Sequence, residues 1–151
     1  MQRILLIIAL VIASLTLSYF VEHILKIPPC ALCLYQRYIY IVALIILLPY
    51  FVKPSLEKYF LVASAFIFTI GGVIALYHFG VEQKVFKGLA SCSFSNAKNV
   101  EDFKRMLEST VPDCSTPTKI LGISMSFANF IWSVFLTIIC LKFSKNATKS
   151  S

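Results

Sequence analysis

Residues 59–80 of this chain read YFLVASAFIFTIGGVIALYHFG, a continuous apolar run that contains no lysine, arginine or carboxylate. The hydrocarbon core of a bilayer is about 30 Å thick, and a helix needs roughly 20 apolar residues to cross it. Three further stretches meet this requirement, at about residues 4–25, 33–52 and 123–143. Because their apolar residues are continuous and do not alternate with polar ones, the four stretches predict transmembrane helices and not the strands of a barrel.

The composition of the whole chain supports the same fold class. The 151 residues are 58% hydrophobic and 14% charged, and the mean hydropathy is +0.82. The four spans leave almost nothing for a separate soluble core. We therefore expect one domain, residues 1–151, built as an all-α bundle of four transmembrane helices with one long outer loop at about residues 81–122. A short interfacial helix is expected on this loop, because four apolar residues share one helical face: Val100, Phe103, Met106 and Leu107. The alternative is a helix that packs on top of the bundle.

The net charge of +7 does not indicate nucleic-acid binding, because the basic residues flank the spans and form no stripe on a soluble face. If both termini lie on one side, the short segments on that side are rich in basic residues, namely Arg3, Lys53, Lys58, Lys142, Lys145 and Lys149. The positive-inside rule then predicts cytoplasmic termini and an extracytoplasmic outer loop. We expect the first span to be retained, because no small-x-small cleavage site follows it.

Four of the five cysteines are predicted to lie on the outer side of the membrane. Cys30 and Cys33 form a Cys-x-x-Cys in the first turn of the second span. Disulfides persist in oxidising compartments, which suits this location. A bridge over so short a loop stabilises little, and a strained one is labile, so this pair favours a redox role over a structural one. Cys140 lies deep in the last span and is expected to be a packing residue.

The second pair, Cys92 and Cys114, lies in the outer loop. Its wide spacing alone suits a disulfide that staples the loop. Beside an intramembrane Cys-x-x-Cys, we interpret it instead as a second redox pair. Zinc sites of the finger type usually offer two close pairs of ligands, whereas here one pair is close and the other wide, so no metal site is expected.

Arg37 lies four residues after Cys33, on the same face of the predicted helix and one turn deeper. A fixed cation there would favour a thiolate and an anionic electron acceptor. Charged residues within spans are costly and are functional candidates for that reason. The alternative is that Arg37 extends its guanidinium to the outer headgroups.

The string Pro29-Cys30-Ala31-Leu32-Cys33-Leu34-Tyr35-Gln36-Arg37 resembles the signature of the DsbB family of bacterial quinone-dependent disulfide oxidases. The resemblance extends to the residues around Cys92 and Cys114 and to Leu121-Gly122-Ile123-Ser124-Met125, so it covers essentially the whole chain. It implies that Cys92 forms the mixed disulfide with a reduced DsbA-type, thioredoxin-like oxidase and that Cys114 resolves it. It also implies that Cys33 lies next to a quinone ring and that Cys30 is its exchange partner.

By the same resemblance, Arg37 supports quinone binding, and electrons pass through ubiquinone or menaquinone to the respiratory chain of the bacterial inner membrane. His78 lies near a polar position of the family's quinone site, or is an ordinary interfacial histidine. The chain departs from the family pattern at Gln36, where many members carry an acid. Asn129 and Trp132 are expected to make packing or inter-helix contacts.

Three other functions are compatible with part of this pattern. A vitamin K epoxide reductase-like protein also combines four helices with two cysteine pairs, but there the Cys-x-x-Cys follows the loop pair in the sequence. A membrane thiol reductase would move electrons outward. A non-enzymatic binding module would use the cysteines only as disulfide staples.

Overall fold

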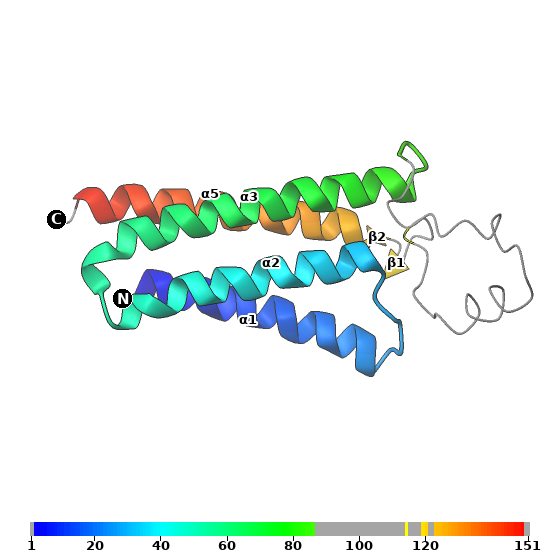
Figure 1. Ribbon diagram of the computed structural model, residues 1–151, viewed down its shortest axis with the longest axis horizontal. Coiled ribbons are helices and arrows are strands. Elements are labelled where there is room, and N and C mark those ends of the chain that lie inside the picture. The colour runs from blue at the N-terminus through cyan, green and yellow to red at the C-terminus, as the bar shows by residue number, and fades with distance from the viewer. Residues whose placement is uncertain (1, 87–113, 115–118, 121–122, 150–151) are drawn as a thin grey trace, which may run out of the picture.

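The computed structural model describes residues 2–86, 114, 119–120 and 123–149. Within these residues the chain forms four long helices, α1 (Gln2–His23), α2 (Ala31–Leu47), α3 (Glu57–Glu82) and α5 (Met125–Lys149). They lie side by side along one axis (Figure 1), and α2 contacts both α1 and α3 while α3 also packs along α5. Four helical segments are long and apolar enough to cross a membrane. The predicted four-helix membrane fold is confirmed.

The predicted ends of the spans differ from the observed ones by a few residues. The second span ends in a 3-10 helix, η1 (Leu48–Phe51), with Pro49 in its first turn. Proline lacks the amide hydrogen that the α-helical ladder needs, which explains why α2 stops at Leu47. A second 3-10 turn, η2 (Pro54–Leu56), leads into α3. The last helix continues to Lys149, beyond the predicted end near residue 143.

A small antiparallel pair of strands precedes α5, which the all-helical prediction did not include. Strand β1 (Lys119–Ile120) pairs with β2 (Ile123–Ser124), with Lys119 opposite Ser124. β2 leads directly into α5. The expected interfacial helix near residues 100–108, and Cys92, lie outside the described residues.

The core of the bundle is apolar along most of its length. Cys140 is fully buried in it, as expected for a packing residue, and its other buried members are Ile4, Ile7, Val11, Tyr40, Ala43, Leu47, Tyr50, Leu61, Ala65, Phe68 and Leu136. Large apolar side chains also cover the outside of the helices, among them Tyr59, Phe66 and Val73. An apolar exterior is what a helix needs where it faces lipid.

Gly71 and Gly72 of α3 lie at a close contact between helices. A Cβ atom at Gly71 would lie 2.9 Å from Ile39 Cγ2 on α2, and one at Gly72 would lie 3.6 Å from Ser133 Cβ on α5. Small residues allow helix backbones to approach closely in membranes. The contact brings α2, α3 and α5 close together near the middle of α3.

Candidate active site

Cys30 and Cys33 lie together at the start of α2. Cys30 is the N-cap residue, with extended backbone angles (φ −75°, ψ 169°), and Cys33 lies in the first turn. The two sulfur atoms are 3.2 Å apart, with the Cys30 thiol donating to Cys33 Sγ. The prediction that Cys30 belongs to the first helical turn is therefore wrong by one residue. Its extended backbone lets its sulfur reach Cys33 without distorting the helix.

A third predicted cysteine packs at the same place. Cys114 is 3% exposed and belongs to one buried cluster with Cys30, Leu32 and Val81, against which Cys33 also packs. The fold thus brings together three of the four cysteines that the sequence singled out. The fourth, Cys92, lies outside the described residues.

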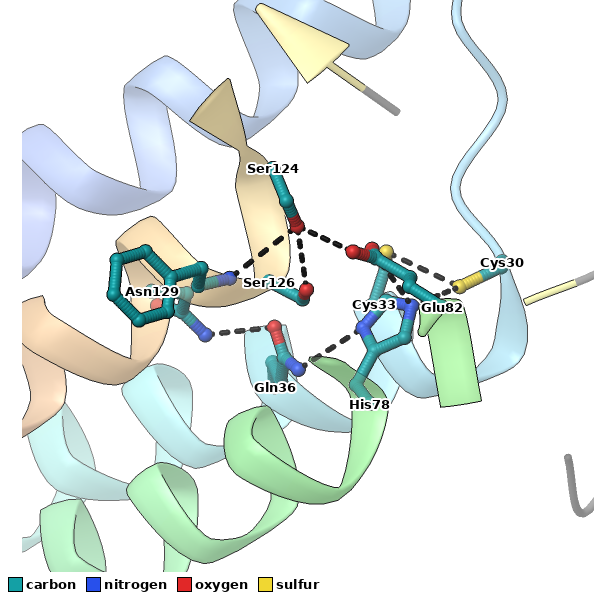
Figure 2. A network of polar contacts seen from close by, with 9 residues as sticks. Cys30, Cys33, Gln36, His78, Glu82, Ser124, Ser126 and Asn129 are labelled. Carbon is teal, nitrogen blue, oxygen red and sulfur yellow. Dashed lines mark hydrogen bonds and ion pairs between the residues drawn. The ribbon is translucent and has the colours of Figure 1, made fainter. Parts of the chain in front are cut away.

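His78, in the last turns of α3, points at this dithiol from the neighbouring helix (Figure 2). Its Nε2 atom lies 3.5 Å from Cys30 Sγ, and its Nδ1 atom lies 3.3 Å from the amide nitrogen of Gln36. The ring is buried, with 4% of the residue exposed. His78 therefore does not lie at the surface of the protein, and it adjoins the thiols. Its predicted role in quinone binding stays a prediction.

Glu82, the last residue of α3, is a buried carboxylate that the sequence analysis missed. Its Oε1 atom lies 3.6 Å from His78 Nε2, and its Oε2 atom accepts a hydrogen bond from the hydroxyl of Ser124. Ser124 also contacts Ser126 Oγ at 2.7 Å (Figure 2). The sequence signal was available, because an acid four residues after a histidine at the end of an apolar span shares that histidine's helix face.

A chain of amide and hydroxyl groups continues from His78 into the bundle. Gln36 accepts a hydrogen bond of 2.7 Å from the amide nitrogen of Asn129, and Asn129 Oδ1 accepts one of 2.5 Å from the Tyr40 hydroxyl. Asn129 therefore makes the expected inter-helix contact, between α5 and α2. Trp132 does the same toward α1, because its indole nitrogen donates to Ser14 Oγ at 2.7 Å.

Arg37 is directed toward α1. Its Nη1 atom lies 2.7 Å from Glu22 Oε2, and Nε and Nη2 donate to Ser18 Oγ at 3.2 and 3.0 Å. The guanidinium carbon also lies 4.3 Å from the centre of the Tyr19 ring. Only 10% of the side chain is exposed, so the guanidinium is held within the α1–α2 seam and does not extend freely to the headgroups. Among the described residues its contacts are with α1 and not with the thiols.

The electrostatics of the dithiol are asymmetric. The hydrogen bond to Cys33 raises the pKa of the Cys30 thiol to about 12, burial acts in the same direction, and the contact with His78 opposes both. At neutral pH Cys30 is therefore a thiol that donates its hydrogen to the Cys33 sulfur. A sulfur that accepts a hydrogen bond is stabilised as a thiolate, the reactive form for disulfide exchange.

The same three side chains could also hold a soft metal ion. The ligand atoms of Cys30, Cys33 and His78 all lie within 4.8 Å of one another. The donor set is thiol and imidazole, which zinc accepts. The expectation of no metal site stays a prediction.

Four apolar helices with a Cys-x-x-Cys dithiol at one end of the bundle are typical of a membrane protein of thiol–disulfide chemistry. The family model of the disulfide bond formation protein DsbB matches residues 2–143, and the chain belongs to this family. An uncharacterized protein of Rickettsia prowazekii (strain Madrid E), RP370, is 30% identical over 140 residues, which cover 89% of this chain and 81% of that protein. No solved structure matches the chain significantly. Membership in the family makes this a membrane disulfide oxidoreductase that serves disulfide bond formation.

Proposed function

We propose that the protein reoxidises a DsbA-type, thioredoxin-like thiol oxidase and passes the electrons to a membrane quinone. The observation that carries the proposal is the burial of Cys114 in one cluster with Cys30, beside Cys33. A loop cysteine that packs against a dithiol is in position for disulfide exchange with it. The role of Cys92 in the proposal is the one that the family resemblance implies.

Electrons would enter the protein by thiol–disulfide exchange between the reduced partner and the loop pair. A thiolate of the reduced partner attacks Cys92 in the Cys92–Cys114 disulfide, and Cys114 leaves as a thiolate. The partner's second thiolate then releases Cys92, so the partner gains a disulfide and the loop pair gains two electrons. In the next step Cys114 attacks Cys30 in a Cys30–Cys33 disulfide, and Cys33 leaves as a thiolate. Cys92 then attacks Cys114 and releases Cys30, so the loop disulfide forms again and Cys30 and Cys33 become a dithiol. A bound quinone would supply the acceptor for the two electrons and two protons of the resulting dithiol.

The asymmetry of the dithiol supports separate roles for its two sulfurs. Cys30 is buried in one cluster with Cys114, which suits the sulfur that exchanges with the loop. Cys33 accepts the hydrogen bond from Cys30 and is partly exposed. We therefore assign Cys33 as the sulfur that faces the acceptor.

The residues near Cys33 suit a quinone. A guanidinium has five N–H groups, and the three hydrogen bonds of Arg37 to Ser18 and Glu22, counted over the described residues, leave N–H groups for a ring carbonyl. Aromatic side chains of α2, Tyr35 and Tyr38, are exposed on the outside of the bundle, where a lipid-soluble ring would approach. We propose that Arg37 binds the quinone from the α1 side and that His78 acts on the opposite, thiol side of the site.

The arrangement of the bundle supports the proposed orientation in a bacterial inner membrane. Both termini lie at one end of the helices, and the start of α2, the end of α3 and the β1–β2 pair lie at the other (Figure 1). With cytoplasmic termini, the thiols therefore face the extracytoplasmic side. A membrane-impermeant maleimide added to intact cells should label the reduced outer cysteines.

A turnover assay tests the function. Purified protein is mixed with a reduced thioredoxin-like oxidase and a soluble quinone analogue, and the quinone absorbance is followed. We expect turnover in the wild type, its loss in Cys33→Ser and Cys92→Ser, and its retention in Cys140→Ser, which removes a cysteine buried in the core. A binding module would reduce no quinone, and bound zinc in stoichiometric amount would favour a metal site.

A further inference from the structure

The series of hydrogen bonds that leads from Tyr40 to His78 has one donor-to-acceptor direction. Tyr40 donates its hydroxyl hydrogen to Asn129 Oδ1. The amide nitrogen of Asn129 then faces and donates to Gln36 Oε1. This leaves the amide nitrogen of Gln36 facing His78 Nδ1, at 3.3 Å (Figure 2).

An amide nitrogen carries two hydrogens and accepts none, so the ring nitrogen opposite it must be the acceptor. In a neutral imidazole one nitrogen is the acceptor and the other carries the hydrogen. The hydrogen of His78 therefore sits on Nε2. The hydrogen bonds from Tyr40 to Asn129, from Asn129 to Gln36 and from Gln36 to His78 all run in the same direction. An amide whose oxygen accepts a hydrogen bond on one side presents its nitrogen, a donor, to the next residue.

We propose that Tyr40, Asn129 and Gln36 are positioning residues that hold His78 as the Nε2–H tautomer, so that it donates a hydrogen bond to Cys30 and does not act as its base. The tautomer follows from the contacts alone. Its role in thiol exchange rests on the proposed function.

The surroundings of Nε2 show what this hydrogen would do. Two acceptors lie at nearly equal distance from it, Cys30 Sγ at 3.5 Å and Glu82 Oε1 at 3.6 Å. Ser124 holds the other carboxylate oxygen of Glu82. Cys30 gives its own hydrogen to Cys33, so its sulfur lone pairs are available to Nε2–H. When Cys30 becomes a thiolate during exchange, the same hydrogen stabilises the negative sulfur.

The Nε2–H tautomer requires a hydrogen-bond donor at position 36, which Gln36 supplies. A carboxylate there would have no hydrogen to donate and would accept one from Nδ1 instead. The Gln36→Glu change should therefore move the ring hydrogen to Nδ1 and leave Nε2 as an acceptor or as part of an imidazolium. The shape of the side chain is almost unchanged by this substitution.

Nitrogen NMR of the full-length, reduced protein in detergent tests this directly. The chain has two histidines, so ¹⁵N-histidine labelling with a His23→Gln variant assigns the ring signals of His78. We expect the pattern of the Nε2–H tautomer in the wild type and a shift of the proton to Nδ1 in Gln36→Glu. Tyr40→Phe removes the first donor and should give a mixture of tautomers.

Ser133→Ala is the matched control, because Ser133 also approaches the Tyr40 hydroxyl, at 3.4 Å, but does not continue the chain. It should leave the tautomer unchanged. A wild-type Nδ1–H signal, or the same tautomer in wild type, Gln36→Glu and Tyr40→Phe, would overturn the proposal. If Gln36→Glu does not fold, Tyr40→Phe alone decides. No quinone or partner is present, so the result is independent of the turnover assay.

Discussion

The sulfur of Cys30 lies 3.2 Å from that of Cys33 and donates a hydrogen bond to it. The two cysteines differ in position by only one helical turn, but the N-cap backbone of Cys30 places it outside the helix and Cys33 within it. This small difference makes one sulfur a buried donor and the other a partly exposed acceptor.

Alkylation of the reduced protein should distinguish the two thiols. The hydrogen bond to Cys33 and burial raise the pKa of the Cys30 thiol to about 12, although the contact with His78 opposes both. The thiolate is the nucleophile, so the reactivity of Cys30 should be low at neutral pH and should increase about tenfold per pH unit until pH approaches that pKa. Iodoacetamide at neutral pH should therefore modify Cys33 first, as read by peptide mass spectrometry.

The Cys33→Ala variant tests whether the hydrogen bond to Cys33 causes the raised pKa of Cys30. It removes the acceptor that contributes most to the raised pKa of Cys30, so Cys30 should react at lower pH in the variant. Faster labelling of Cys30 than of Cys33 in the wild type at neutral pH would contradict the assignment.

Removal of one cysteine from each pair should trap the exchange step. In a Cys33→Ser, Cys92→Ser double variant, Cys30 and Cys114 remain in their shared buried cluster. Mild oxidation should join them in a disulfide that no internal thiol of either pair can resolve, and non-reducing peptide mapping should find it. The Cys30→Ser, Cys92→Ser variant, which keeps Cys33 and Cys114, should form much less of the corresponding crosslink. Equal yields in the two variants would argue against Cys30 as the exchange partner.

Arg37→Ala should weaken quinone use more than it weakens folding. Loss of one charge-assisted hydrogen bond corresponds to about 1.5–3 kcal/mol, so KM for a quinone analogue should rise by about tenfold or more. Glu22→Gln is the matched control, because it removes the ion pair but keeps the guanidinium beside Ser18 and Tyr19. Unchanged quinone kinetics with a lowered melting temperature in Arg37→Ala would give the residue a purely architectural role.

The two glycines of α3 should differ in their tolerance of a methyl group. Gly71→Ala places a Cβ atom 2.9 Å from Ile39, whereas Gly72→Ala places one at an ordinary 3.6 Å from Ser133. Overpacking typically costs about 1–3 kcal/mol. We expect a clear loss of thermal stability in detergent for Gly71→Ala and a small change for Gly72→Ala. The reverse order would show that α2 and α3 are less closely packed than described.

The sequence predicted the fold well because a bilayer imposes a simple requirement, a long apolar run, on each helix. Cys30 and Cys33 were also predictable, because their spacing is local. The contacts of Gln36 with His78 and with Asn129 were not, because these residues come from α2, α3 and α5, whose relative rotation no single segment encodes. The pairing of Arg37 with Glu22 was missed for the same reason, since it depends on how α1 packs against α2.

The most direct test of the central claim uses a Cys92→Ser, Cys114→Ser variant that keeps only the Cys30–Cys33 dithiol of the two pairs. The variant is reduced, freed of reductant and mixed with a soluble quinone analogue without any partner protein. We expect one quinone to be reduced for each Cys30–Cys33 disulfide formed, as followed by absorbance and mass spectrometry. A dithiol that stays reduced while the quinone absorbance does not change would contradict it.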